Sequence, residues 1–260
     1  MPGRLKTLIV IPTFNERESL PGLARQALNL SEDFCLLVVD DNSPDGTGAA
    51  AEKSAQEFPG RMWVLHRPGK QGLGSAYING FLWGLARPER FGYFIQMDAD
   101  GSHEPSSIPD LLKAAESADL AIGSRYIGGV RVLDWPMRRL LLSYLSNVLV
   151  RVATGLPLSD CTSGFKCFPR RTMERIPWEK IHAMSYDFQI EVNFFCRSIG
   201  LRLQEVPITF LNRNQGASKL SRADIIRAAG ALRRLALQRI IAPFNRSWRD
   251  GGTASREDAG

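Results

Sequence analysis

Cysteine and histidine are scarce in this chain of 260 residues, which contains four cysteines and three histidines. No two cysteines form a CxxC pair, and His66, His103 and His182 share no spacing typical of metal ligands. This scarcity excludes a disulfide framework and a Cys/His zinc site. Cys35 and Cys196 stand among apolar residues, so they are predicted to be small core side chains, and the histidines are predicted to be structural.

Long apolar runs are also lacking. The longest candidate, Leu140–Val150, is interrupted by two serines and an asparagine and falls far short of the roughly 20 apolar residues of a membrane-spanning helix. The first residues, Met1–Lys6, lead directly into a strand-like segment and do not have the pattern of a signal peptide. We therefore expect a protein that is soluble or bound at the surface of a membrane.

The composition is that of a globular protein, with 44% hydrophobic and 23% charged residues. Its net charge of +6 is unevenly distributed. The segment Arg213–Arg249 has nine Lys and Arg residues and one acid, so it carries +8 and the rest of the chain carries −2. An anionic partner is therefore expected near the C-terminal end of the sequence.

The first half of the chain alternates short apolar segments with amphipathic ones, which is the pattern of an α/β fold with a mostly parallel sheet. The predicted strands are Thr7–Ile11, Cys35–Val39, Met62–His66, Tyr93–Met97 and Leu120–Ile122. Asn15 is predicted to cap a helix that runs to about Leu30. Because ligands of such sheets bind beyond the carboxyl ends of the strands, the polar loops after these strands are the expected functional region.

The second half contains three predicted helices, a strand over Leu201–Phe210 and a polar loop bracketed by Arg213 and Lys219. The predicted helices are Trp135–Thr154, Tyr186–Ile199 and Arg222–Arg239. Two basic amphipathic stretches, Trp135–Thr154 and Arg222–Trp248, favour an anionic membrane surface, although packing on the sheet explains their apolar faces equally well. The two cations of the polar loop can neutralise a pyrophosphate, or they are solvated surface charge.

Asp98 and Asp100 follow the fourth predicted strand. Side chains two residues apart in an extended chain point the same way, so the two carboxylates converge at the strand end. Such a pair suits a hard cation and leaves room for phosphate oxygens and water. A solvated turn explains the sequence Asp-Ala-Asp-Gly equally well. The pair alone therefore leaves a metal site and a turn as alternatives.

Other polar groups follow the first two strands. Asp40 and Asp41 are adjacent, so at most one of them faces a ligand directly, and a helix start is the alternative. The segment Pro12–Glu16 offers a carboxylate and an aromatic ring to a nucleoside, and it too resembles a helix start. The GLG sequence at 72–74 lacks the third glycine of a dinucleotide-binding loop, so that interpretation is rejected.

Eight segments, taken in order, resemble those of one family. They are PTFNERE after the first strand, VVDDNSPDGT after the second, GLGSAY, MDADGSHEP, GSRY, DCTSGFK, YDFQIEV and EVPITF. Over Leu8–Arg239 the chain resembles the dolichyl-phosphate or polyprenyl-phosphate mannosyltransferases, inverting enzymes of glycosyltransferase family two. The resemblance implies the GT-A fold, an α/β fold with a mostly parallel central sheet and helices on both faces. It implies one catalytic domain over 1–248, with a nucleotide-sugar half to about residue 125, an acceptor half from about 126, and a disordered tail at 249–260.

The resemblance also implies roles for individual residues. The implied lining of a guanosine pocket is Pro12, Phe14, Glu16, Val39 and Asp41. Asp98, Ala99 and Asp100 are implied to hold the sugar pyrophosphate, and the two aspartates to bind Mg²⁺ or Mn²⁺. Some relatives have a glutamine ligand two residues after the second aspartate. This chain has Ser102 there, so water is the expected replacement.

The implied reaction transfers mannose from GDP-mannose to a polyprenyl phosphate and gives β-mannosyl phosphopolyprenol. The acceptor phosphate is already an anion at pH 7, so it needs no strong general base. Arg125 is implied near the reacting phosphates, and Arg213 and Lys219 belong to a loop that closes over the donor. With the metal, these cations stabilise the charge on the leaving nucleoside diphosphate.

The motifs leave two alternatives open. Another donor such as UDP-glucose, or a soluble glycan acceptor, fits the same fold, and a glycan hydroxyl would need Asp187 or Glu191 as its base. A non-catalytic protein that binds lipid or nucleotide is the alternative from another class, although it would not need both aspartates.

The expected location is cytoplasmic and peripheral, on the cytoplasmic face of a membrane. Many relatives have C-terminal membrane helices that this sequence lacks, so it is expected to act alone or with a separate membrane-anchoring protein. The expected partners are therefore GDP-mannose, a polyprenyl phosphate and a membrane surface, and not a nucleic acid.

Overall fold

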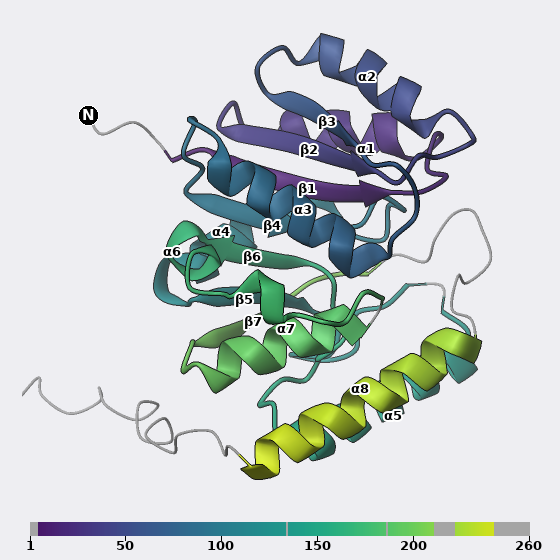
Figure 1. Cartoon of the computed structure of the whole chain (residues 1–260), viewed down its shortest axis with the longest axis vertical. Helices are drawn as coiled ribbons and strands as arrows, with labels where there is room; N and C mark the ends of the chain where they lie inside the picture. Colours follow the sequence, from purple (N-terminus) through teal and green to yellow (C-terminus); the bar gives the residue numbers. More distant parts are fainter. Residues whose placement is uncertain (1–4, 134, 186, 211–221, 242–260) are drawn as a thin grey trace, which may run out of the picture.

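The computed structural model describes residues 5–133, 135–185, 187–210 and 222–241, apart from the side chains of 222–226 (Figure 1). The tail at 249–260 lies outside these residues. The described strands are β1 (Thr7–Thr13), β2 (Phe34–Asp40), β3 (Met62–His66), β4 (Tyr93–Gln96), β5 (Leu120–Ser124), β6 (Lys166–Pro169) and β7 (Leu203–Pro207). They form one sheet with the order β3-β2-β1-β4-β6-β5-β7.

The sheet is mostly parallel, as the sequence predicted. β3, β2, β1 and β4 pair in parallel, and β5 pairs in parallel with β7. β6 is antiparallel to both of its neighbours, β4 and β5. Because β1, β2 and β4 run in the same direction, their carboxyl ends share one edge of the sheet, and the loops that follow them are brought together there.

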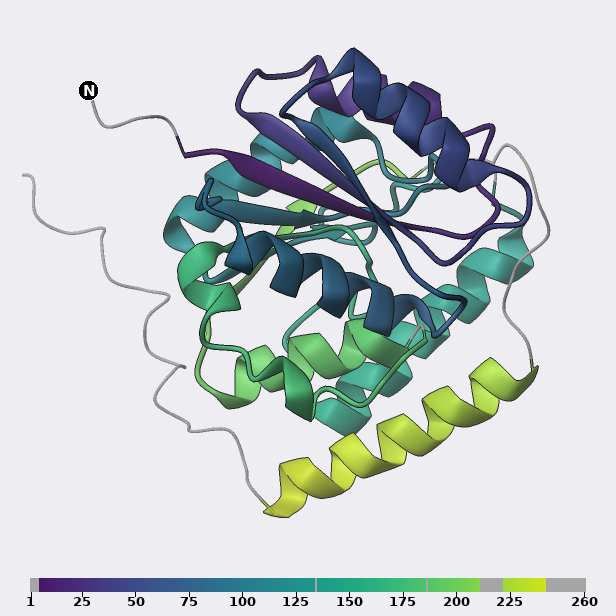
Figure 2. The ribbon, with the colours of Figure 1, turned by 45° about the horizontal axis from the view of Figure 1, so that its top comes forward.

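Helices cover both faces of the sheet (Figures 1 and 2). They are α1 (Leu20–Leu28), α2 (Thr47–Glu57), α3 (Leu73–Ala86), α4 (Ile108–Ser117), α5 (Met137–Thr154), α6 (Arg170–Met173), α7 (Asp187–Ser198) and α8 (Arg222–Ile241). Buried side chains of α1, α2 and α4 form one apolar cluster, and those of α3, α6 and α7 belong to a second. In β1, Leu8 and Val10 belong to the second cluster and Ile9 and Ile11 to the first, so the sheet separates the two.

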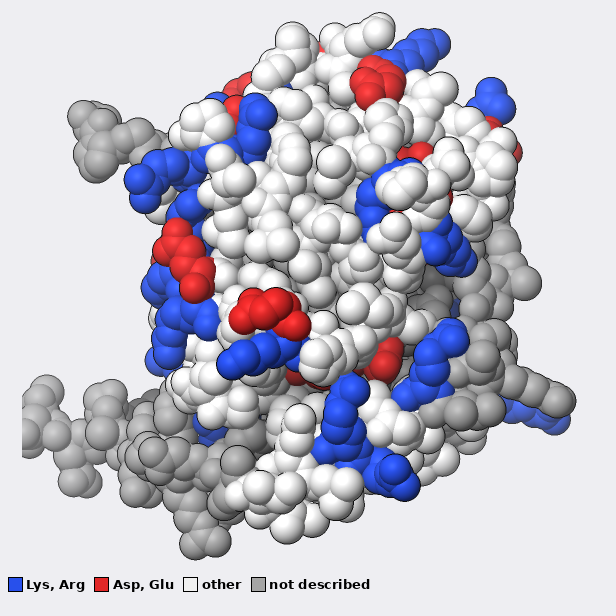
Figure 3. All heavy atoms as spheres, in the orientation of Figure 1, with Lys and Arg blue, Asp and Glu red and all other residues white. Residues whose placement is uncertain are grey.

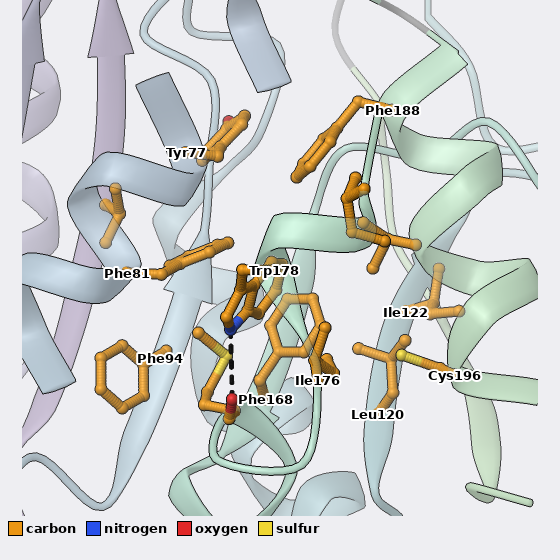
Figure 4. Packing of buried hydrophobic residues seen from close by; sticks show 14 of the residues in the cluster. Tyr77, Phe81, Phe94, Leu120, Ile122, Phe168, Ile176, Trp178, Phe188 and Cys196 are labelled. Atoms are coloured by element: carbon orange, nitrogen blue, oxygen red, sulfur yellow. Dashed lines mark hydrogen bonds between the residues drawn. The ribbon is translucent and has the colours of Figure 1, made fainter. Parts of the chain in front are cut away.

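α3 lies close against the sheet. A Cβ atom at Gly80 would collide with the side chain of Val10, so a larger residue would push the helix outward. Next to this glycine the packing is aromatic, because the ring of Phe81 contacts those of Phe94 and Trp178 (Figure 4). This packing fixes the position of α3, whose first turn lies near the ends of the strands.

The predicted helix start at Asn15 is wrong. α1 begins at Leu20, and Asn15 has a left-handed backbone with φ 60° in the loop after β1. Its N–H donates to the hydroxyl of Ser43 at 3.1 Å, so it joins the loops after β1 and β2 instead of capping a helix. Asparagine tolerates this conformation better than most residues.

α5 and α8 lie side by side at one end of the molecule (Figures 1 and 2), and Arg239 Nη1 donates to the carbonyl of Val152 at 2.8 Å. In α5 the buried residues are Asn147, Val150 and Thr154. What we call the α5–α8 apolar face consists of the large exposed residues Met137, Leu141, Leu142, Tyr144, Leu145, Leu149, Val152, Leu237, Ile240 and Ile241. None of the helices that the structure describes has the length and apolar content required of a membrane span.

Candidate active site

A cavity of about 850 Å³ lies at the sheet edge where β1, β2 and β4 end. Its walls come from the loops after these strands, the loop before α3 and the start of that helix, the segment 182–185, Asp187 and α8. The expected site residues in its lining are Pro12, Phe14, Glu16, Asp41, Asp98, Ala99 and Asp100. The fold therefore brings together groups that are up to 88 positions apart in the sequence.

The two aspartates after β4 are held by hydroxyl groups. Asp98 accepts a hydrogen bond from the Tyr77 hydroxyl at 2.7 Å. Asp100 accepts one from the hydroxyl of Ser102 at 2.6 Å and one from its backbone N–H at 3.0 Å. The backbone N–H of Asp98 donates to Nδ1 of His103 at 3.1 Å. This bonding fixes the orientation of both carboxylates.

Burial determines the protonation states of Tyr77 and His103, the two side chains next to the aspartates. Tyr77 is fully buried, with its ring stacked on those of Phe81 and Phe188 (Figure 4). Burial, together with the charge of Asp98, raises the pKa of Tyr77 far above its usual value, so the hydroxyl stays protonated and donates. Burial lowers the pKa of His103, and its neutral ring carries the proton on Nε2 because Nδ1 accepts. His103 therefore holds the backbone of Asp98, which agrees with the structural role predicted for it.

Asp98 and Asp100 fit a divalent cation by the chemistry of their donors, because both are carboxylates that line the cavity. Within the described ranges, no group of three or more His, Cys, Asp or Glu residues could hold a metal ion. A cation at the pair would therefore take its other ligands from phosphate oxygens and water. Ser102, at the position of the third ligand, is bonded to Asp100.

The loops after β1 and β2 form another part of the cavity. Nζ of Lys70 lies 4.6 Å from the centroid of the Phe14 ring. Asp41 forms a buried ion pair with Arg67 at 2.7 Å. Burial raises the pKa of Asp41, and the charge of Arg67 only partly opposes the rise. Asp40 accepts hydrogen bonds from two neighbouring hydroxyls, so only Asp41 of the adjacent pair lines the cavity.

Two expected site residues lie outside the lining of the cavity. The side chain of Val39 is fully buried in the core beneath α3. Arg125 is buried in a bidentate ion pair with Asp160, with both N–O distances at 2.6 Å. Burial alone would lower the pKa of Arg125, but the Asp160 carboxylate outweighs burial and raises it. Arg213 and Lys219 lie outside the described residues.

The segment 182–185 is a wall of the cavity that the sequence did not reveal. It packs against the start of α3, where the N–H of Gly74 donates to the Met184 carbonyl at 3.1 Å. A Cβ atom at Gly72 would collide with that carbonyl, and one at Gly74 would stand 2.5 Å from the carbonyl oxygen of Ala183. The GLG sequence therefore allows two backbone segments to approach each other, which gives a physical reason for its two glycines.

α8 supplies the last wall. Arg227, Gly230, Ala231 and Arg234 line the cavity, and their spacing is that of one helix face. This periodicity was present in the sequence, but nothing there indicated that this face of the helix turns to the strand ends. Of the two candidate bases for a glycan hydroxyl, Asp187 lines the cavity. Glu191 is engaged elsewhere, in hydrogen bonds to two backbone amides and to Arg234.

Comparison with known families identifies the chain. The model of the family Glycosyl transferase family 2 matches residues 8–176, more than half of the sequence. The chain belongs to glycosyltransferase family 2. This glycosyltransferase has its carboxylate pair, the loops after β1 and β2 and most of the cavity lining within the matched segment, whereas α7 and α8 lie beyond it.

Two curated relatives resemble this glycosyltransferase over most of its length. It is 44% identical over 221 residues to the polyprenol monophosphomannose synthase of Mycolicibacterium smegmatis, a match that covers 85% of this chain and 83% of the relative. It is 44% identical over 220 residues to the undecaprenyl-phosphate mannosyltransferase of Micrococcus luteus, covering 84% and 88%.

Solved structures share the fold at low sequence identity. One is the glucosyl-3-phosphoglycerate synthase of Mycobacterium tuberculosis in complex with Mn²⁺, UDP-glucose and phosphoglyceric acid, with a TM-score of 0.66 and 18% identity. That match covers 89% of this glycosyltransferase and 80% of the other chain. Another is the mannosyl-3-phosphoglycerate synthase of Rubrobacter xylanophilus, with a TM-score of 0.63, 18% identity, and coverage of 91% and 74%. The GT-A fold expected from the sequence is confirmed.

Proposed function

We propose that this glycosyltransferase transfers mannose from GDP-mannose to a polyprenyl phosphate at a membrane surface, with inversion, and releases β-mannosyl phosphopolyprenol and GDP. The observation that carries the proposal is the single cavity in which Asp98 and Asp100 lie between the strand-end loops and the basic face of α8. The names of the two curated relatives support both the sugar and the lipid acceptor.

The donor is assigned to the strand-end side of the cavity. Phe14, Glu16 and Asp41 are proposed to contact the guanosine. An aromatic ring can stack on the base, and carboxylates can accept hydrogen bonds from the N–H groups of the base and from the ribose hydroxyls. Asp98 and Asp100 would hold Mg²⁺ or Mn²⁺ next to the diphosphate. A fold relative that binds Mn²⁺ together with a nucleotide sugar supports this assignment.

The chemistry needs a stabilised leaving group more than a base. When bound, the cation would supply positive charge where the β-phosphate gains negative charge. Tyr77 and Ser102 hold the carboxylates in place, so little reorganisation is required as that charge develops. We propose that Arg213 and Lys219 add to the stabilisation, and that a single displacement by the acceptor phosphate inverts the anomeric carbon.

Arg125 is assigned a different part in the proposal. Its guanidinium is fixed by Asp160 and lies 5.3 Å from the centroid of the Phe210 ring and 5.6 Å from that of Trp135. A buried arginine that is paired with a carboxylate carries no net charge as a pair, and its guanidinium is held in place. We propose that Arg125 lies near the reacting phosphates and orders the loop after β5 through its pairing with Asp160.

The α5–α8 apolar face is proposed to dock on an anionic lipid surface. Apolar side chains with 49–82% exposure are costly in water and insert readily at the boundary of headgroups and acyl chains. Basic side chains accompany them, and Figure 3 shows blue Lys and Arg atoms over α8 beside uncharged surface. Each basic residue near such a surface contributes about 1 kcal/mol of attraction. Docking would place the enzyme peripherally on the cytoplasmic face, where the acceptor phosphate lies.

The test is a transfer assay with radiolabelled GDP-mannose, a polyprenyl phosphate in vesicles, and extraction of the product into organic solvent. Label in the organic phase is expected with GDP-mannose, and much less with UDP-glucose or GDP-glucose in parallel reactions. If label is transferred only from UDP-glucose, then UDP-glucose and not GDP-mannose is the donor. If label reaches only a soluble glycan, then the glycan and not the lipid is the acceptor. Asp187 would then be the proposed base, since it lines the cavity.

A further inference from the structure

Glu191, on α7, joins two walls of the cavity. One carboxylate oxygen accepts hydrogen bonds from the backbone N–H groups of His182 and Ala183, at 3.0 and 2.6 Å. The other accepts one from Nη2 of Arg234, on α8, at 2.7 Å. The Glu191 side chain is 8% exposed and that of Arg234 is 40% exposed. A buried carboxylate thus holds the segment 182–185 by its backbone and is itself held by α8.

The segment 182–185 has little freedom to adjust at its other contact. Its carbonyl groups press against Gly72 and Gly74 at the start of α3, with no space for a Cβ atom there. Its four residues all line the cavity. A shift of Glu191 would therefore be transmitted to the cavity wall, because the opposite side cannot absorb the movement.

α8 faces two environments at once. Its face at 227, 230, 231 and 234 lines the cavity, while Leu237, Ile240 and Ile241 belong to the α5–α8 apolar face. An interaction that fixes the apolar part of α8 also fixes Arg234, only one helical turn away from Leu237. Arg234 is the described side chain through which α8 bonds to Glu191.

We propose that Arg234 is a positioning residue that couples docking of α8 on an anionic lipid surface to the order of the cavity wall 182–185, so that the nucleotide binds more tightly on the membrane than in solution. The inference rests on the proposed function, because it assumes that the cavity takes a nucleoside diphosphate and that the apolar face meets lipid. A coupling of this kind is reciprocal: the nucleotide must strengthen lipid binding by the same factor by which lipid strengthens nucleotide binding.

The experiment measures GDP affinity by titration calorimetry, with Mg²⁺, in the presence and absence of phosphatidylglycerol vesicles. Wild type is compared with Arg234→Ala and with Arg233→Ala as the matched control, since Arg233 is the exposed neighbour on the same helix. Each variant loses one positive charge, and only Arg234→Ala loses the bond to Glu191. Vesicles are expected to tighten GDP binding by about fivefold or more in wild type and in Arg233→Ala, and not in Arg234→Ala.

Two further readouts separate coupling from simple stabilisation. Hydrogen exchange of the peptide that contains residues 182–185 is expected to slow on vesicle binding in wild type and to be insensitive to vesicles in Arg234→Ala. Arg234→Lys, which keeps the charge and one donor, is expected to restore part of the effect. GDP is expected to raise the affinity of wild type for the vesicles, obtained from co-sedimentation at several lipid concentrations, by the factor found in the calorimetry.

The outcomes distinguish this inference from the proposed function. Equal enhancement by vesicles in wild type and Arg234→Ala, or GDP binding in wild type that vesicles do not change, overturns the coupling. Wild type that fails to sediment with vesicles overturns it as well. The proposed function fails separately, if wild type binds no GDP or transfers no mannose to a polyprenyl phosphate dispersed in detergent.

Discussion

Two regions of the molecule differ in the burial of their side chains. They are the strand-end region, formed by the loops after β1, β2 and β4, and the α5–α8 region. All seven residues of β2 are buried, and its polar neighbours are tied to one another by short hydrogen bonds. In α5 most of the leucines are exposed, and two of the three buried residues, Asn147 and Thr154, are polar. The polar groups of the first region have partners within the protein, whereas the second region leaves a large apolar area exposed.

The difference separates two requirements of one enzyme. A site for charged groups needs side chains that do not move, so Tyr77, Ser102 and His103 hold the aspartates. The surface that we propose to meet a lipid needs exposed apolar area, and α5, which carries most of it, has only three buried residues.

Removal of divalent cations is expected to have the largest effect. In excess EDTA mannose transfer should fall below detection, because two carboxylates without a cation would repel the diphosphate. Addition of Mg²⁺ or Mn²⁺ should restore it. Circular dichroism serves as the control and should not change. Undiminished turnover in EDTA would show that transfer needs no cation in the strand-end region.

Asp100→Ala is expected to lower the rate of transfer on the order of 10²-fold or more, the scale of losing a main stabiliser of developing charge. Asp110→Ala is the matched control, since Asp110 is an exposed aspartate in the first turn of α4. Both variants should keep the circular dichroism of wild type. Activity of Asp100→Ala within a few-fold of the control would show that the carboxylate pair is only a turn.

Tyr77→Phe tests the support behind the pair. It removes one hydroxyl and keeps the stacked ring, so the affinity for Mn²⁺ is expected to fall by about tenfold, as for other residues that orient metal ligands. The measurement is a titration of Mn²⁺ followed by electron paramagnetic resonance in the presence of GDP. Tyr144→Phe, on the exposed surface of α5, is the control. Equal affinities in the two variants would contradict the prediction.

A change in the α5–α8 region should affect lipid binding and leave the strand-end region intact. Leu145→Ser/Leu149→Ser is expected to weaken co-sedimentation with phosphatidylglycerol vesicles by about tenfold, because two leucines of 60% exposure lose their apolar insertion. Leu30→Ser is the control, with 44% exposure at a distant site. Near 1 M salt, where the Debye length is about 3 Å, binding of wild type should also weaken. Equal pelleting of all samples would exclude docking through the α5–α8 apolar face, and a membrane-anchoring protein would become the proposed occupant of that face.

A further effect is expected at Lys166, which is fully buried in β6. Burial lowers the pKa of Lys166 to about 7, and its amine donates to the side-chain oxygen of Gln189 at 2.7 Å. Between about pH 7 and the usual lysine pKa of 10.5, the unfolded chain binds the proton and the folded one does not. Stability should therefore rise with pH in this window, by at most about 1.4 kcal/mol per pH unit.

Urea denaturation at pH 7 and pH 9 measures this rise. Lys166→Met is the comparison, since it removes the titrating group and keeps an unbranched chain, and its stability should depend less on pH. A Lys166→Met variant with the same pH dependence as wild type would show that another group titrates.

The sequence predicted the strand-end region better than the rest of the site. Asp41, Asp98 and Asp100 follow buried strands closely. The local pattern and the geometry of a parallel sheet were therefore sufficient to predict that they lie near one another. The hydrogen bonds that hold these aspartates could not be predicted in the same way. The bond from Tyr77 to Asp98 spans 21 positions, and it depends on how closely α3 packs on the sheet.

The walls from segment 182–185 and α8 were missed for a related reason. The basic face of α8 was visible as a periodic pattern, but the pattern does not say what the helix packs against. Arg234 and Glu191 are 43 positions apart and meet only because α7 and α8 are neighbours. Arg125 was located by resemblance alone, and its pairing with Asp160 became visible only in the structure.

The antiparallel strand β6 has a consequence for the way in which the chain folds. It lies between β4 and β5, and the chain reaches it only after α5. During synthesis β4 and β5 therefore each lack one neighbouring strand until Lys166–Pro169 has left the ribosome. We expect the segment that contains β1 to β5 and the segment that follows it to unfold in a single cooperative transition, because β6 joins β4 and β5 within one sheet.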